Sequence, residues 1–194
     1  QIMANLKKSA EYYQNQRETV SDVWQQVKQK GLKATWQDRS MWNQMRMSET
    51  DIADVTGYTY TFLMNGTTPD DNWTALFARG EKVRLRFINS AAMTIFDVRI
   101  PGLSMLVVQA DGNNVQPVKV DEFRIGVAET YDVIIQPRDE KALTIFAETM
   151  SRRGYARATL APREGMSGAI PERREPPRLT MADMSMEMPG MDHG

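Results

Sequence analysis

The hydrophobic period of this 194-residue chain changes near residue 57. Beyond that point apolar and polar side chains alternate in short runs, as in Val83-Arg-Leu-Arg-Phe87 and Tyr131-Asp-Val-Ile-Ile135. Turn pairs such as Asn65-Gly66 and Asp111-Gly112 separate the runs. Alternation with a period of two is typical of strands with one buried face. Seven or eight such strands without helical sequence between them predict an antiparallel β-sandwich or barrel over residues 57–161.

Residues 1–56 have a helical period instead, so we expect an N-terminal helical segment there. Gly31 predicts the end of one helix, and Thr35-x-x-Asp38 resembles a capping box that would open a second. All four tryptophans fall in or just after this segment, and we expect them to pack against a core or a neighbouring domain. The side chains at helical spacing in the first of these helices include Val20, Val23, Trp24 and Val27.

Residues 162–194 differ again, with five of the nine prolines and almost no β-branched or aromatic residues. This composition predicts a linker followed by a disordered, Met-rich C-terminal tail. The chain starts at Gln1 in helix-like sequence and opens with neither a signal peptide nor an initiator Met, so we read that start as a cut end.

Composition excludes several classes of site and partner. The chain has no Cys and a single His, which excludes thiolate metal sites, a Cys nucleophile and a Ser–His–Asp triad inside the fold. The net charge of −1 argues against a nucleic-acid partner. The apolar runs are a few residues long, far short of the roughly 20 that span a bilayer, so no membrane partner is expected.

Methionine is the one residue type whose distribution suggests chemistry. Of 14 methionines, five lie in the last 14 residues. Thioether sulfur is a soft ligand that prefers Cu(I) to hard cations, and clustered thioethers can wrap one such ion. Methionine more often fills cores, but this segment lacks apolar partners beyond Leu179. The residues leave both interpretations open; the candidate metal ligands are Met181, Met184, Met186, Met188, Met191 and His193.

Several long motifs in the sequence are similar to those of one protein family. It resembles the bacterial copper-resistance multicopper oxidases of the copper resistance protein A type, and the likeness covers nearly the whole chain. The segments that carry it include Thr59-Tyr-Thr-Phe-Leu-Met-Asn-Gly66, Gly80-Glu-Lys-Val-Arg-Leu-Arg-Phe-Ile-Asn89, Met93-Thr-Ile-Phe-Asp-Val-Arg-Ile-Pro-Gly102 and Val120-Asp-Glu-Phe-Arg-Ile-Gly-Val-Ala-Glu-Thr-Tyr-Asp-Val133.

The resemblance implies a cupredoxin-like Greek-key β-sandwich and a periplasmic, copper-dependent enzyme that reduces O₂. Catalytic copper in this family is held by His-x-His and His-Cys-His motifs of the first and third domains. This chain resembles the second domain, so no catalytic or cofactor-binding residue carries over to it. The implied partners are copper ions and the flanking cupredoxin domains of a parent chain.

Three hypotheses follow. The first is a middle, non-catalytic domain of a copper-resistance multicopper oxidase, inactive by itself. The alternative is a stand-alone copper-binding module that uses its Met-rich tail. The third is a purely structural interaction domain without affinity for soft metals.

Overall fold

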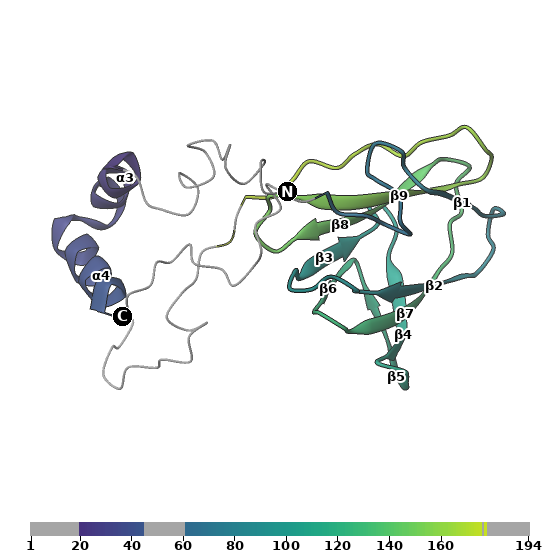
Figure 1. Cartoon of the computed structure of the whole chain (residues 1–194), viewed down its shortest axis with the longest axis horizontal. Coiled ribbons are helices and arrows are strands. Elements are labelled where there is room, and N and C mark those ends of the chain that lie inside the picture. Colours follow the sequence, from purple (N-terminus) through teal and green to yellow (C-terminus); the bar gives the residue numbers. More distant parts are fainter. Residues whose placement is uncertain (1–19, 45–60, 176, 178–194) are drawn as a thin grey trace. The chain divides into compact units, whose positions relative to one another are not determined.

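The computed structural model describes residues 20–44, 61–175 and 177. The chain divides into two compact units, one formed by residues 1–53 with 176–194 and the other by residues 54–175 (Figure 1). Each unit is described by itself below. Within the described residues, no helix combines the length and apolarity needed to cross a membrane.

The described part of the first unit is a pair of helices, α3 (Val20–Lys30) and α4 (Leu32–Gln44). Gly31 separates them with φ +83°, a left-handed conformation that glycine adopts without strain. Its backbone N–H donates to the Val27 carbonyl at 3.0 Å. The helical segment and the helix end at Gly31 are therefore confirmed where the structure describes them.

The capping box predicted at Thr35 is wrong. Helix α4 already begins at Leu32, directly after Gly31, so Thr35 lies inside the helix. Its hydroxyl donates to the Gly31 carbonyl four residues earlier, at 2.9 Å, rather than accepting from a later N–H. Of the helical tryptophans, Trp42 is buried, whereas Trp24 and Trp36 are 61% and 76% exposed.

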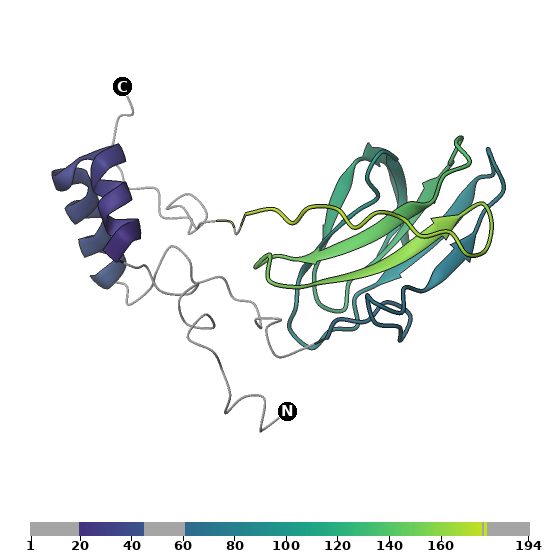
Figure 2. The same cartoon turned by 90° about the horizontal axis from the view of Figure 1, so that it is seen from above.

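The second unit is a sandwich of two sheets, which confirms the mainly β fold (Figures 1 and 2). The five-stranded sheet has the order β1-β9-β8-β3-β6, and the four-stranded sheet has the order β2-β7-β4-β5. Only the β1–β9 pair is parallel among these strands. The strands are β1 (Thr74–Leu76), β2 (Val83–Ile88), β3 (Phe96–Arg99), β4 (Met105–Ala110), β5 (Asn113–Val120), β6 (Glu122–Ile125), β7 (Thr130–Ile135), β8 (Leu143–Thr149) and β9 (Tyr155–Ala161).

Two strands have no counterpart among the predicted runs. Strand β1 has only three residues, and β5 contains Asn113, Asn114 and Pro117, which disfavour strands. Strand β5 forms at the sheet edge, where a proline costs no ladder hydrogen bond. Conversely, residues 61–64 lie in the region predicted to form strands but are not a strand; Met64 forms one isolated bridge with Thr67.

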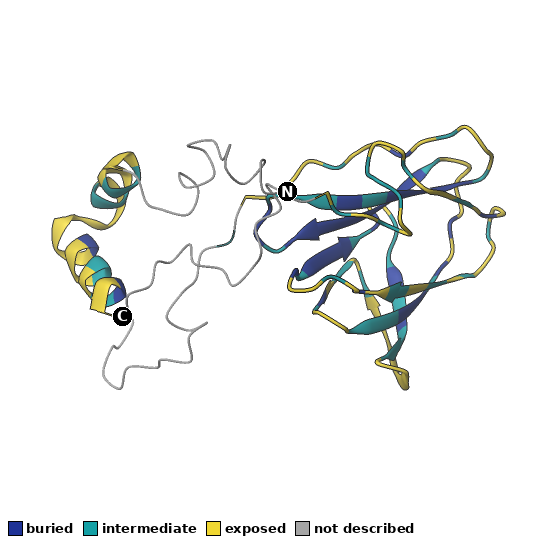
Figure 3. Ribbon diagram, viewed as in Figure 1, coloured by how far each residue is buried: buried dark blue, intermediate teal, exposed yellow. Residues whose placement is uncertain are grey.

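The core lies between the sheets and is built from apolar side chains of both. Figure 3 shows that the buried residues lie mainly on the strands, whereas β5 is largely exposed. Strand β8 differs because all seven of its residues are buried, which means that its outer face is covered as well. The most buried inward side chains include Ile100, Met105, Val133, Ile135 and Leu160.

Residues 162–175, here called the strap, cover that outer face. The strap runs back along β8 and β9 (Figure 2), although a linker was expected from residue 162. The Thr144 hydroxyl donates to the Ala169 carbonyl at 2.6 Å, and the Gly168 N–H donates to the Thr159 hydroxyl at 3.2 Å. Glycine is needed at 168 because a side chain there would collide with Thr144.

Neighbouring strands provide a direct test of this core. Leu160 on β9 is 1% exposed, and Leu76 on β1 is 53% exposed. We expect Leu160→Ala to lower the free energy of unfolding by about 3 kcal/mol, because it leaves a cavity, and the control Leu76→Ala to lower it by less than about 1 kcal/mol. Urea unfolding measures both. Equal losses would show that Leu160 is not in a packed core.

Candidate functional site

The predicted copper ligands Met181, Met184, Met186, Met188, Met191 and His193 lie outside the described residues, so this site stays a prediction. Across residues 20–44, 61–175 and 177, the structure holds no group of three or more His, Cys, Asp or Glu side chains that could bind a metal. A blue-copper centre needs a Cys thiolate and two His, and the chain has no Cys. The residues present therefore do not fit the catalytic copper that the resemblance associates with its family.

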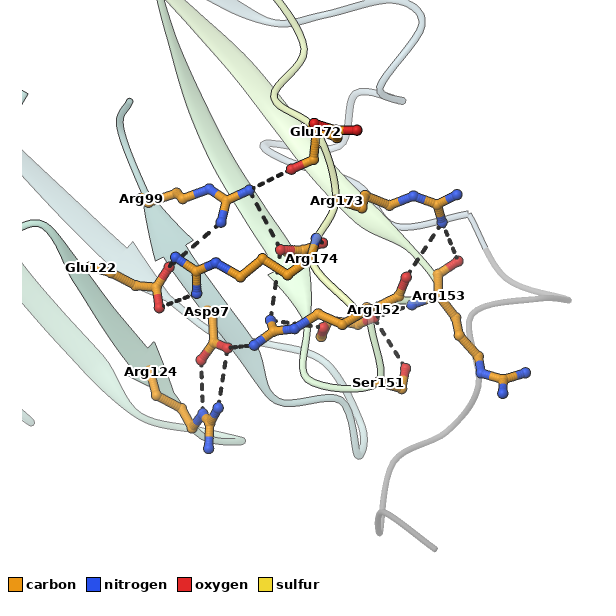
Figure 4. A network of polar contacts seen from close by, with 12 residues as sticks. Asp97, Arg99, Glu122, Arg124, Ser151, Arg152, Arg153, Glu172, Arg173 and Arg174 are labelled. Atoms are coloured by element: carbon orange, nitrogen blue, oxygen red, sulfur yellow. Dashed lines mark hydrogen bonds and ion pairs between the residues drawn. The ribbon is translucent and has the colours of Figure 1, made fainter. Parts of the chain in front are cut away.

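A network of charged side chains lies on the outer face of the five-stranded sheet (Figure 4). Strand alternation places it there: Phe96 and Val98 of β3 pack inward, so Asp97 and Arg99 point outward. The network joins three neighbouring strands, the turn after β8 and the strap. Its members are Asp97, Arg99, Glu122, Arg124, Glu148, Arg152 and Arg174.

Asp97 is the best-paired carboxylate of this network. It is 3% exposed and accepts from Arg124 Nε at 2.8 Å and Arg124 Nη2 at 3.1 Å, while Arg152 Nη2 lies 2.6 Å away. Burial by itself would raise the pKa of Asp97, but the hydrogen bonds from Arg124 and Arg152 outweigh it and hold the pKa below 3.8. Asp97 is therefore an ionised anchor between β3, β6 and the turn after β8.

Glu148 and Glu122 bind the end of the strap. Glu148, at 1% exposure, accepts the backbone N–H of Arg174 at 3.0 Å, and its other oxygen lies 3.6 Å from Arg99 Nη2. Glu122 pairs with the Arg174 guanidinium at 2.5 Å. Arg99 also donates to the Glu172 carbonyl at 2.9 Å. Each of the three carboxylates faces two arginines, so the cluster fixes the strap on the sheet.

Sequence reasoning missed this network. Asp121-Glu122 suggests a solvated turn, but only Asp121 fits that interpretation: it is exposed and accepts a hydrogen bond from the Ser104 hydroxyl at 2.7 Å. The available signal was the placement of Asp97 and Glu148 inside predicted strands, at positions that an uncovered sheet would expose to water. The strap decides that they are buried.

Arg84 and Arg86 converge on one carboxylate of the other sheet. Arg84 Nη2 lies 2.6 Å and Arg86 Nε 3.2 Å from Oδ2 of Asp132, which is 6% exposed. The arginine side chains are 48% and 70% exposed. Two cations share one carboxylate, so Asp132 balances only one of their two charges.

An apolar cleft of about 860 Å³ opens beside these arginines, between β2 and residues 62–66. Its floor includes Ala147 and Ala156, which are cross-strand partners on β8 and β9 and leave space because they are small. Large apolar side chains line its mouth although they are exposed: Leu63 at 54%, Trp73 at 36% and Ile88 at 69%.

The Asp97 network predicts a pH-dependent contribution to stability. We expect Asp97→Asn to lower the free energy of unfolding by about 3 kcal/mol at pH 7, because it removes the nearer of the two carboxylates beside the buried Arg152. Since the pKa of Asp97 is lowered on folding, this contribution is present above the ordinary pKa of 3.8 and is lost as the pH falls through the lowered value.

Chemical unfolding between pH 7 and pH 2 measures this effect. The difference between the two proteins should shrink with falling pH. The control is Asp139→Asn, whose carboxylate is 70% exposed and pairs with Lys141, and it should change stability by less than about 1 kcal/mol. A pH-independent difference for Asp97→Asn would contradict the prediction.

Two curated proteins are similar over nearly the whole chain. Copper resistance protein A of Escherichia coli is 58% identical over 197 residues, covering 99% of this chain and 32% of that protein. Copper resistance protein A of Pseudomonas syringae pv. tomato is 55% identical over 193 residues, covering 100% of this chain and 31% of that protein. The chain thus spans about a third of the length of these curated relatives.

A solved structure gives the same fold. Fet3p, a multicopper oxidase that functions in iron import, matches with a TM-score of 0.50 and 18% identity over 56% of this chain and 22% of that chain. At this identity the likeness shows the fold alone, and it confirms the cupredoxin-like sandwich. The family model "Multicopper oxidase" matches residues 18–165, which include both described helices and every described strand. The chain therefore belongs to the multicopper oxidase family.

Proposed function

We propose that this chain is the middle, non-catalytic part of a periplasmic copper-resistance multicopper oxidase, whose complete chain would use copper to reduce O₂. The observation that carries the proposal is the 58% identity to a copper resistance protein A of which this chain covers 32%. The composition agrees with a non-catalytic role, because a blue-copper centre needs a Cys thiolate and two His, whereas the sequence has no Cys and a single His.

The proposed role is architectural. The sandwich is a packed block, and the Asp97 network fixes the strap on the outer face of its five-stranded sheet. A block of this kind can hold neighbouring domains at a constant separation, and copper sites that exchange electrons need such constancy. The threefold greater length of the relatives favours this proposal over a stand-alone copper-binding module.

We further propose that the Met-rich tail contributes copper binding to the complete protein. Met181, Met184, Met186, Met188 and Met191 supply soft thioether sulfurs, and His193 supplies an imidazole nitrogen. These donors suit Cu(I) better than a hard cation. The tail follows the strap by a few residues, so its attachment point depends on the contacts of Arg174.

The central proposal predicts activity only in the complete protein. With added copper and a reducing substrate, this chain by itself should consume no O₂ above the buffer rate, whereas the complete gene product should. An oxygen electrode measures both, and reading the gene in both directions should show His-x-His upstream and His-Cys-His downstream. O₂ consumption by this chain, with copper retained after desalting, would contradict the proposal.

The tail predicts Cu(I) binding that a competing Cu(I) chelator can measure. Replacing Met181, Met184, Met186, Met188 and Met191 together by Leu should weaken binding at least about tenfold, because the soft donors are lost. Truncation after Pro177 should do the same while it keeps the strap contacts. The control is Met93→Leu, an exposed methionine outside the tail. Equal Cu(I) affinity in all variants would eliminate the tail as the site.

A further inference from the structure

The cleft beside β2 is an unusual surface for a single folded unit. Its mouth carries three exposed large apolar side chains, Leu63, Trp73 and Ile88. Its interior reaches Phe96 and Val98, which belong to the buried core. Contiguous apolar surface of this kind marks a binding site more often than a solvated face.

The geometry of the sandwich explains why the cleft exists. Strand β2 is an edge strand, hydrogen-bonded only to β7 among the described strands. Its inward residues Val83, Leu85 and Phe87 are only partly buried, whereas Val133 and Ile135 of β7 are fully buried. The layer between the two sheets is therefore less well filled at the β2 edge.

Residues 62–66 form one wall of the cleft, and Phe62 in this wall packs against the core. The ring of Phe62 packs edge-on against Phe96, with centroids 5.3 Å apart and an interplanar angle of 89°. Gly154 permits this position, because a side chain there would collide with the Phe62 ring. The packing of Phe62 against Phe96 and Gly154 supports this wall. The next residue, Leu63, lies at the mouth of the cleft.

The cleft is lined by positively charged side chains as well as apolar ones. Arg84 and Arg86 also line the cleft, and they share the single carboxylate of Asp132. A complementary surface would combine an apolar ridge with at least one carboxylate beside it. A small apolar ligand would leave this positive charge unmatched.

We propose that this cleft is the docking site for a flanking domain of the longer protein, which inserts an apolar ridge into it and places carboxylates against Arg84 and Arg86. This inference rests on the proposed function, in which the chain is one part of a larger oxidase. The occupant is argued from chain length: about two thirds of the 58% identical relative lies outside the matched region. Burial of Ile88, Leu63 and Trp73 by such a domain removes their apolar surface from water.

Thiol labelling tests the proposal, because this chain has no Cys and one introduced thiol is a unique reporter in it. Ile88→Cys places the reporter at the cleft, and Leu76→Cys, at 53% exposure and outside the cleft lining, is the matched control. Each variant is made in the complete protein and in the 194-residue chain. Maleimide modification of the peptide is followed by mass spectrometry, with the unfolded protein as the reference rate.

In the complete protein the thiol at position 88 should react at least about tenfold more slowly than in the 194-residue chain, because a covered thiol reacts only when the interface opens. The control thiol at position 76 should change by less than about twofold. Adding Arg86→Glu should speed the reaction at position 88 in the complete protein, since it opposes the partner's carboxylates. Lys119→Glu on β5 should leave that reaction unchanged.

Other outcomes overturn the proposal. Equal rates at position 88 in both proteins would show that no flanking domain covers the cleft. Protection in the dilute 194-residue chain would assign the cover to residues 45–60 of the same chain, and protection that grows with its concentration would assign it to a second copy. If Arg86→Glu does not change the reaction rate at position 88 in the complete protein, the partner places no carboxylates against Arg86.

Copper content and O₂ consumption, measured on the same complete protein, keep this inference separate from the proposed function. A protected thiol in a protein without oxidase activity would overturn the oxidase assignment and leave the docking site standing. A freely reactive thiol at position 88 in an active oxidase would overturn the docking site alone.

Discussion

Buried charge on the outer face of the five-stranded sheet is the constraint on which the rest of the sandwich depends. Asp97 and Glu148 are carboxylates with 3% and 1% exposure, and a buried carboxylate without a partner costs several kcal/mol. Arg152 lies beside both, and the backbone N–H of Arg174 donates to Oε1 of Glu148. Oε2 of Glu148 has the charges of Arg99 and Arg152 nearby but no hydrogen-bond partner among the described residues. Order in the strap is therefore coupled to order in the sheet, and the folded unit extends past its last strand.

The same constraint limits the chemistry of this face. Each carboxylate of the network lies beside guanidinium groups, which hold it in place on the sheet. Within the described residues the features left for function are surfaces: the strap fixed on one sheet and the apolar cleft beside β2. Both suit the architectural role proposed above.

The helices and strands were predictable where a local pattern dominates. The period of two predicted most strands of the sandwich, and Gly31 predicted the helix end, because both signals depend on neighbouring residues. Strand β5 could not be predicted, since its pairing with β4 overrides the poor strand propensity of Asn113 and Pro117. The capping box at Thr35 was a wrong prediction for the opposite reason: the residue type fits a cap, but α4 begins three residues earlier, at Leu32.

The sequence by itself determined the β class of the fold, the absence of a thiolate copper ligand and the likeness to copper-resistance oxidases. Only the tertiary structure decided which charges are buried, why the segment after residue 161 is bound to the sheet, and where the cleft opens. The physical reason is range: alternation relates adjacent residues, whereas Asp97 meets Arg124 across 27 positions and Glu122 meets Arg174 across 52. Such pairs exist only after the sheets have formed, so no local pattern contains them.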